Sequence, residues 1–254
     1  LWRGASGGSA FRRGYLFGLG AFGIGVNWVY ISMHEYGGMG PLLAGFVTLL
    51  LAASMALFPA LAGLLAARFA RLRASRLGRH AWILAFPASW MLFEWVRGWF
   101  LTGFPWLHLG YSQIDAPLAG YAPLLGVYGV SLFGALSAAL LLAAVFEAGR
   151  PRRAALAAFI VLWLGGVVLG FIDWTRSAGE PLRVSLIQGN VPQDLKWHPA
   201  MREVTVELYA RLTRENWDSD LIIWPETAMP MYYAEARSYL EALAEEAAPH
   251  DASL

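Results

Sequence analysis

The chain has 254 residues, of which 57% are hydrophobic and only 15% are charged. Soluble domains usually carry about 25% charged residues, so this balance is unusual for a soluble protein. The formal net charge of +1 offers no basic surface for nucleic acid, and we expect no nucleic-acid partner. The sequence contains no cysteine, which excludes disulfides, thiolate metal sites and a cysteine nucleophile within these residues.

Five long apolar blocks follow one another through the first 173 residues. A helix needs about 20 apolar residues to cross a bilayer core of about 30 Å, and these blocks lack the polar face of a soluble amphipathic helix. We therefore predict a polytopic α-helical membrane domain over residues 1–173. Its five predicted helices cover residues 14–33, 41–67, 81–101, 123–147 and 154–173.

Arginines are concentrated in three of the connections around these blocks, whereas the other two connections carry neither Lys nor Arg. Basic residues favour the cytoplasmic side of a membrane, so the arginine-rich connections are predicted to lie in the cytoplasm. Five crossings from a cytoplasmic start place residue 174 outside. The arginines are Arg3, Arg12 and Arg13 before the first block, Arg68, Arg71, Arg73, Arg76 and Arg79 before the third, and Arg150, Arg152 and Arg153 before the fifth.

Two charged residues, Glu94 and Arg97, lie near the end of the third block and three residues apart on one helix face. Charges within a membrane helix are costly and are usually paired or functional, and we expect an i,i+3 ion pair between these two. The connection from Leu101 to Pro123 is too rich in Gly, Pro and aromatic residues to form one helix. It would serve either as an aromatic belt at the lipid headgroups or as a surface that handles a lipid.

Residues 174–254 have the composition of a soluble α/β segment. The runs 183–189 and 220–224 are predicted to be strands, and residues 199–217 carry apolar residues at helical spacing. A strand, a crossover helix and a second strand predict a βαβ unit whose parallel sheet is buried on both faces. A further helix is expected over residues 234–247.

One carboxylate, Glu226, follows the second predicted strand by two residues, and Pro225 restricts the backbone between them. Gln188 and Asn190 follow the first strand, and ligands of open α/β sheets gather at the carboxyl ends of strands. Trp224 and the apolar run AMPMYY would exclude part of the water from Glu226, which suits a general base. These residues alone leave two interpretations open, a catalytic base or an ordinary acid at a strand end.

Two stretches of this segment, IIWPETA and VSLIQGNVPQDLKW, resemble the nitrilase-like domain of the apolipoprotein N-acyltransferase family. In the membrane half, GVNWVYISMHEYGGM and EWVRGWFLTGFPWLHLGYSQIDAPLAGYAPLLGV are similar to the same family. The resemblance covers residues 11–245. Nitrilases in general share only the WPE-like element, so the other stretches make the resemblance specific.

The resemblance implies a bacterial inner-membrane helix bundle that carries an α/β/β/α nitrilase-like domain on its periplasmic side, with residues 180–254 as the N-terminal part of that domain. Members transfer an acyl chain from a phospholipid, usually phosphatidylethanolamine, through a Cys thioester to the N-terminal diacylglyceryl-cysteine of an apolipoprotein. Glu226 corresponds to the general base of the family, and no cofactor or metal is implied. Trp197, Gln188 and Trp224 are expected to contact substrate, with plain packing as the alternative for Trp197.

The chain departs from the family pattern in its catalytic partners. It has no Cys, and its single lysine, Lys196, does not match the position of the family's catalytic lysine. We therefore expect this chain, which begins at Leu1 and not at Met, to be a fragment of an acyltransferase. We expect no activity from the fragment alone. The alternatives are a membrane-anchored nitrilase-like amidase and a catalytically inactive relative that binds lipid or protein.

Overall fold

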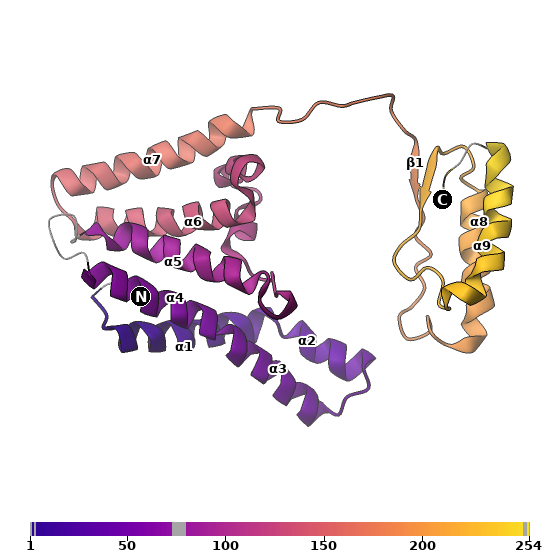
Figure 1. Ribbon diagram of the computed structural model, residues 1–254, viewed down its shortest axis with the longest axis horizontal. Coiled ribbons are helices and arrows are strands. Elements are labelled where there is room, and N and C mark those ends of the chain that lie inside the picture. Colours follow the sequence, from indigo (N-terminus) through magenta and orange to yellow (C-terminus); the bar gives the residue numbers. More distant parts are fainter. Residues whose placement is uncertain (1, 3, 73–79, 251–252, 254) are drawn as a thin grey trace. The chain divides into compact units, whose positions relative to one another are not determined.

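The chain folds into two compact units, residues 1–176 and residues 177–254 (Figure 1). The structure is a computed structural model that describes residues 2, 4–72, 80–250 and 253. The regular elements among the described residues of the first unit are all helices, and the second unit combines a short parallel sheet with helices. Each unit is described by itself below.

The first unit consists of helices that follow the apolar blocks. The residues that connect α5 to α6 form three short 3₁₀ turns, so this connection is not one regular helix, as its composition predicted. The elements are α1 (Gly7–Gly25), α2 (Trp28–Ile31), the π-helical turn η1 (Ser32–Tyr36), α3 (Pro41–Met55), α4 (Leu57–Leu72), α5 (Trp82–Arg97), η3 (Phe100–Thr102), η4 (Leu109–Gln113), η5 (Pro117–Tyr121), α6 (Ala122–Phe146) and α7 (Arg150–Gly170).

Three helical stretches among the described residues are long and apolar enough to cross a membrane, namely Pro41–Ala70, Pro117–Phe146 and Arg150–Gly170. The segments Gly7–Gly25 and Trp28–Tyr36, bent by 47°, make a fourth if they count as one span. The block expected over 81–101 forms α5, whose 16 residues reach only about 24 Å. Five crossings therefore stay a prediction, with α5 as the short member.

Glycines allow α1 and α4 to pack with their backbones in contact. A Cβ atom on Gly18 would lie 2.7 Å from the Cα of Ala56, and one on Gly14 would overlap the carbonyl oxygen of Pro59. Since Gly14 faces Pro59 and the later Gly18 faces the earlier Ala56, the two helices run antiparallel. Small residues permit such close approach in membrane helices, where packing supplies much of the association energy.

We expect Gly14→Ala to destabilise the helical unit, because its new methyl group must push α4 away and overpacking costs about 1–3 kcal/mol. The matched control is Gly20→Ala in the same helix, where a Cβ atom meets nothing within 4 Å. That control should be neutral or slightly stabilising, since alanine favours helix over glycine by about 1 kcal/mol. Thermal unfolding in detergent would compare them, and equal effects of both substitutions would contradict the packing argument.

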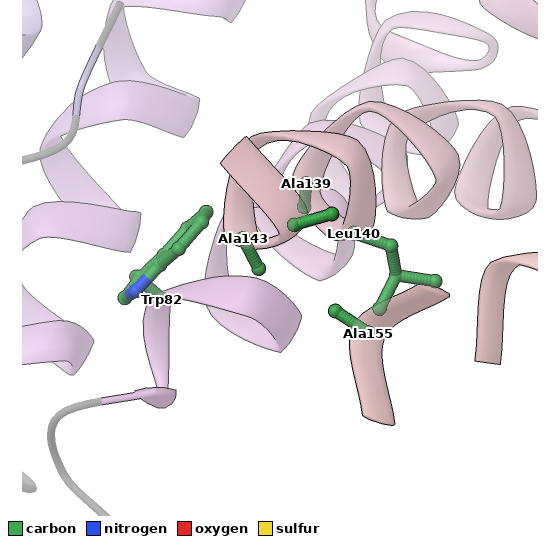
Figure 2. Packing of buried hydrophobic residues seen from close by; sticks show 6 residues of the cluster. Trp82, Ala139, Leu140, Ala143 and Ala155 are labelled. Carbon is green, nitrogen blue, oxygen red and sulfur yellow. The ribbon is translucent and has the colours of Figure 1, made fainter. Parts of the chain in front are cut away.

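A second apolar cluster joins α5, α6 and α7. Figure 2 shows the Trp82 ring from the start of α5 beside Ala139 and Ala143, which lie towards the end of α6. Leu140 of α6 and Ala155, near the start of α7, belong to the same cluster (Figure 2). The start of α5, the end of α6 and the start of α7 thus meet in one cluster, so the three helices alternate in direction.

This alternation brings the arginine-rich segments to one end of the helical unit. Phe86 of α5 packs against the Trp82 cluster and also against a cluster that contains Ala10 of α1 and Ala67 of α4. The start of α1 and the end of α4 therefore lie on the same side as the start of α7. The arginines carried by these segments are Arg12, Arg13, Arg68, Arg71, Arg150, Arg152 and Arg153; Arg3, Arg73, Arg76 and Arg79 lie outside the described residues.

The second unit contains the predicted βαβ arrangement. Strand β1 (Val184–Leu186) pairs in parallel with β2 (Leu221–Ile223), and Val184 lies opposite Leu221. The turn η6 (Pro199–Met201) and helix α8 (Arg202–Arg214) form the crossover, which confirms the predicted sequence of strand, helix and strand. After α9 (Tyr233–Ala247) and η7 (Ala248–His250), Ser253 forms a parallel bridge with Leu221.

Only one face of this sheet is covered, and the prediction of burial on both faces is wrong for these residues. Ile187 and Ile222 are buried in a cluster with Tyr209 of α8. On the other face, Val184 and Leu186 keep 45% and 75% of their surface exposed. The physical reason is that α8 and α9 lie on the same side of the two strands (Figure 1), so no described helix covers the opposite side.

Polar contacts hold α8 and α9 together on the covered side of the sheet. The Arg214 guanidinium donates from Nε to Glu246 Oε2 at 2.8 Å and from Nη2 to Glu246 Oε1 at 3.1 Å. This paired hydrogen bond lowers the pKa of the Glu246 carboxyl. The Tyr239 hydroxyl of α9 also donates to the Val206 carbonyl oxygen of α8 at 3.1 Å.

Candidate functional site

The carboxyl ends of β1 and β2 lie side by side in the second unit. The two strands are parallel and in register, and the hydrogen bond from Ile187 N to Ile223 O, at 2.9 Å, continues the pairing past the end of β1. Gln188 therefore leaves the sheet next to the segment that carries Glu226. This juxtaposition is the one expected for polar residues that follow neighbouring parallel strands.

Glu226 lies in a tight turn that directs its side chain away from the core. Ala228 N donates to the Pro225 carbonyl oxygen at 3.2 Å and closes the turn. Thr227 has a φ of 58°, a left-handed conformation that is uncommon for a β-branched residue. Ala228 is buried in the core cluster, so the turn is anchored on one side and Glu226 projects from the other.

The Glu226 side chain is exposed in this structure, and the expected partial desolvation by the residues around it is not found. Tyr232 and Tyr233 retain 83% and 73% of their surface and do not cover the carboxylate. No residue of the described chain forms an ion pair with it. The carboxylate is thus free to meet a group from outside the described residues.

Trp224, one of the predicted substrate contacts, is tied into the core of the unit. Its indole Nε1 donates to Thr213 Oγ1 at 2.9 Å, and its ring lies 5.5 Å from the ring of Tyr209. Thr213 Oγ1 in turn donates to the Tyr209 carbonyl oxygen at 2.7 Å. These bonds link the residue two places before Glu226 to α8.

The other predicted contacts lie on the surface around the strand ends. Gln188 is exposed, and Trp197 keeps 61% of its surface accessible. The neighbouring Lys196 donates from Nζ to the Glu226 carbonyl oxygen at 3.3 Å. This contact brings the loop after β1 against the turn after β2. Sequence reasoning did not predict it, although Lys196 is the single lysine of the chain.

We expect Thr213→Val to destabilise the second unit, because it removes the acceptor of the Trp224 indole. A buried donor without a partner costs about 1–3 kcal/mol, and Thr213 has 0% exposure. The matched control in the same helix is Thr205→Val, because Thr205 is 1% exposed and its Oγ1 has no partner among the described residues. That control should be neutral or stabilising.

Hydrogen exchange of residues 221–228, measured beside thermal unfolding, would show whether Thr213→Val loosens the turn. If Thr213→Val and Thr205→Val have the same effect on both measurements, Trp224 does not anchor the turn through its indole.

A second polar cluster lies inside the helical unit, around the end of α5. Glu94 and Arg97 are 4% and 3% exposed. The predicted ion pair between them is not found among the ion pairs of the described helical unit. Instead Glu94 Oε1 accepts from Leu109 N at 2.8 Å, and Arg97 Nη1 donates to the carbonyl oxygens of Phe104, at 2.8 Å, and Trp106. Both charges therefore hold the irregular connection after α5, whose backbone groups need hydrogen-bond partners where they are buried.

Among the described residues, no three His, Asp or Glu side chains are arranged to hold a metal ion. Residues 1–140 match the family described as apolipoprotein N-acyltransferase N-terminal domain. The chain belongs to this family.

Relatives named apolipoprotein N-acyltransferase are similar to almost the whole chain. The one from Methylococcus capsulatus is 49% identical over 98% of the chain, the one from Pseudomonas aeruginosa is 45% identical over 99%, and the one from Coxiella burnetii is 43% identical over 96%. These matches cover 49%, 49% and 50% of the respective relatives, so the chain spans about half their length. Family membership and the apolar helices together indicate a multi-pass membrane protein.

Proposed function

We propose that the full-length protein is a phospholipid:apolipoprotein N-acyltransferase of the bacterial inner membrane. It moves an acyl chain from a phosphatidylethanolamine-like donor to the N-terminal diacylglyceryl-cysteine of an apolipoprotein. The observation that carries this proposal is that the chain belongs to the apolipoprotein N-acyltransferase family and resembles the relatives over nearly all of its length. No cofactor or metal takes part in the proposed reaction.

Glu226 acts as the general base in this proposal. It takes the proton of a Cys thiol that the remaining half of the protein supplies, and the thiolate attacks the ester carbonyl of the phospholipid. The C–O bond breaks, the lysophospholipid leaves with the proton, and a thioester remains. Glu226 then takes a proton from the amine of the apolipoprotein as the amine attacks the thioester carbon; the C–S bond breaks, the amide forms, and the proton returns to the Cys sulfur. A Lys, also outside these residues, stabilises the oxyanion of each step.

The nitrilase-like domain, of which residues 180–254 are proposed to form the first part, lies on the periplasmic side in this proposal. The arrangement of the helices supports this topology, because the arginine-rich segments gather at one end of the unit and basic residues favour the cytoplasm. Helix α7 begins at that end, so an α7 that crosses the membrane leads to the opposite side. The exposed Glu226 at paired strand ends supports its role as a group that meets substrate. Trp197 and Gln188, exposed beside it, are proposed to contact the acyl donor.

The proposal is tested by incubating the purified full-length protein with phosphatidylethanolamine that carries a labelled acyl chain. We expect the protein to become labelled and hydroxylamine to remove the label, because hydroxylamine cleaves a thioester. One lysophospholipid should form for each acylated protein. Addition of a synthetic diacylglyceryl-cysteine peptide should then move the label to the peptide. Label transfer that needs neither a thioester nor the peptide amine would contradict the mechanism.

Two alternatives would give different results in the same assay. A membrane-anchored nitrilase-like amidase would release ammonia or an amine from a small amide and leave the protein unlabelled. A catalytically inactive relative would bind the phospholipid without producing lysophospholipid.

A further inference from the structure

A groove with a volume of about 590 Å³ lies between α4 and α5 of the helical unit. Small side chains form its floor, because Ala81, Ala85 and Ala88 follow one another along one face of α5. Leu65 and Phe69 of α4, which share a face of their helix, form one wall. Since an apolar cavity of about 150 Å³ holds a benzene ring, the groove has room for an acyl chain of roughly 16–18 carbons.

The groove has the length of one leaflet of a bilayer. Its lining residues on α5 extend from Ala81 to Leu92, which at 1.5 Å per residue is about 17 Å. Half of a bilayer core of about 30 Å measures about 15 Å. The wall from α4 belongs to Pro41–Ala70, which is long and apolar enough to cross a membrane. Leu84 and Ala88 are exposed, so the groove is open along the surface of the helical unit.

One end of the groove lies at the arginine-rich end of the helical unit, where α4 ends and α5 begins. Arg68 is exposed, directly precedes Phe69 and lies three residues after Leu65, so it borders the groove at this end. It forms no ion pair with another described residue of the helical unit. Glu147, an acidic residue at this end, lies 3.6 Å from His80, and its side chain is only 12% exposed. The positive charge of Arg68 can therefore meet a negatively charged group at the end of the groove.

The charge at this end favours an anionic lipid over a zwitterionic one. A zwitterionic headgroup carries a positive charge beside its phosphate, which Arg68 and the neighbouring arginines repel. Each basic residue near the membrane surface raises the affinity for anionic lipid about fivefold. A soluble anion would meet the same charge but would leave the apolar groove unfilled.

We propose that this groove binds one acyl chain of an anionic phospholipid from the leaflet on the arginine-rich side, with the lipid phosphate beside Arg68. The chain lies on Ala85 and Ala88 and packs against Phe69. The site uses none of the residues proposed for acyl transfer, and it does not depend on that activity.

The test titrates the full-length protein in detergent micelles with phosphatidylglycerol or phosphatidylcholine of identical acyl chains, and native mass spectrometry counts the bound lipids. Phosphatidylcholine is the zwitterionic probe because a phosphatidylethanolamine-like lipid is the proposed acyl donor. We expect the first phosphatidylglycerol to bind at least fivefold more tightly than the first phosphatidylcholine, and inorganic phosphate to leave it bound. Equal affinities of the two lipids, or displacement by inorganic phosphate, would overturn the proposal.

Two substitutions locate the bound lipid. Ala88→Phe puts a ring into the groove and should weaken binding of phosphatidylglycerol at least tenfold, whereas Ala157→Phe on the exposed face of α7 should not. Arg68→Gln should lower the preference for phosphatidylglycerol about fivefold, and Arg176→Gln, at an exposed arginine outside the arginine-rich segments, should preserve it. All four side chains are exposed, so thermal unfolding should stay unchanged. Tight binding to Ala88→Phe, or an unchanged preference in Arg68→Gln, would place the lipid elsewhere and overturn the assignment.

Discussion

Replacing Glu226 by Gln in the full-length protein is expected to lower the rate of acyl-enzyme formation by about 10²–10⁴-fold, the usual contribution of a positioned general base. Gln has nearly the same size and can accept hydrogen bonds, but it cannot take a proton from a thiol. The exposed Glu226 side chain makes no ion pair with the described residues, so its loss should leave the fold unchanged. Thioester formation from labelled phosphatidylethanolamine, measured as a single-turnover rate, checks this result.

The matched control for this prediction is Glu245→Gln, which changes an exposed glutamate of α9 in the same unit. Glu245→Gln should form the acyl-enzyme at the rate of the unaltered protein, and both variants should reach the same abundance in the membrane. If Glu226→Gln forms the thioester at an unchanged rate, Glu226 is not the base. If it fails to accumulate in the membrane, its role is structural.

Replacing Arg97 by Met is expected to produce the largest loss of stability in the helical unit. Arg97 is 3% exposed and donates to the carbonyl oxygens of Phe104 and Trp106. Its removal leaves these acceptors unpaired and leaves Glu94 without a nearby positive charge. Removing one member of a set of buried charges costs about 3–5 kcal/mol. We therefore expect a clear fall in the thermal unfolding temperature in detergent.

The effect of Arg97→Met should be concentrated in the connection after α5. Hydrogen exchange of residues 103–109 should rise more than exchange of α7, because the hydrogen bonds of Arg97 go to Phe104 and Trp106 in the first of these segments. Arg176→Met, which removes an exposed arginine from the same unit, serves as the control and should change neither measurement. Uniform destabilisation without faster exchange at 103–109 would show that Arg97 does not anchor this segment.

The two glutamates, Glu226 and Glu94, are both held in place by hydrogen bonds, but they differ in exposure. In the second unit, Glu226 is held in place through its backbone, by the turn at Thr227 and the contact from Lys196, while its carboxylate remains exposed. In the helical unit, Glu94 is held through its carboxylate and has no exposed face. Exposure leaves the first group available for chemistry, whereas burial makes the second an anchor for the backbone.

Several features could be predicted from the sequence because they depend on local pattern. The apolar blocks predicted the helices of the first unit. The apolar runs and helical spacing within residues 183–224 predicted the strand, helix and strand of the second unit. The position of Glu226 shortly after a strand also followed from the sequence, which predicted two residues where the structure has three after the end of β2. Turn-rich composition correctly excluded a regular helix over Leu101 to Pro123.

Other features depended on contacts between residues that are distant in the sequence. The pattern suggested an ion pair between Glu94 and Arg97, but the chain returns after α5 and offers Leu109 N, Phe104 O and Trp106 O to the two charges. Buried backbone groups need hydrogen-bond partners, and here the two charged side chains supply them instead of pairing with each other. The uncovered sheet face and the exposure of Glu226 likewise follow from where α8 and α9 pack, which no local pattern specifies.

The sequence by itself therefore determined the kinds of elements, their order and the candidate base, because hydrophobic periodicity and turn chemistry act over a few residues. The tertiary structure alone decided which groups each charge meets and which side of the sheet is covered. These features arise from backbone approach at positions such as Gly14 and from the alternating directions of α5, α6 and α7. Such packing depends on two elements that are distant in the sequence, so it cannot be predicted from the local pattern of either one.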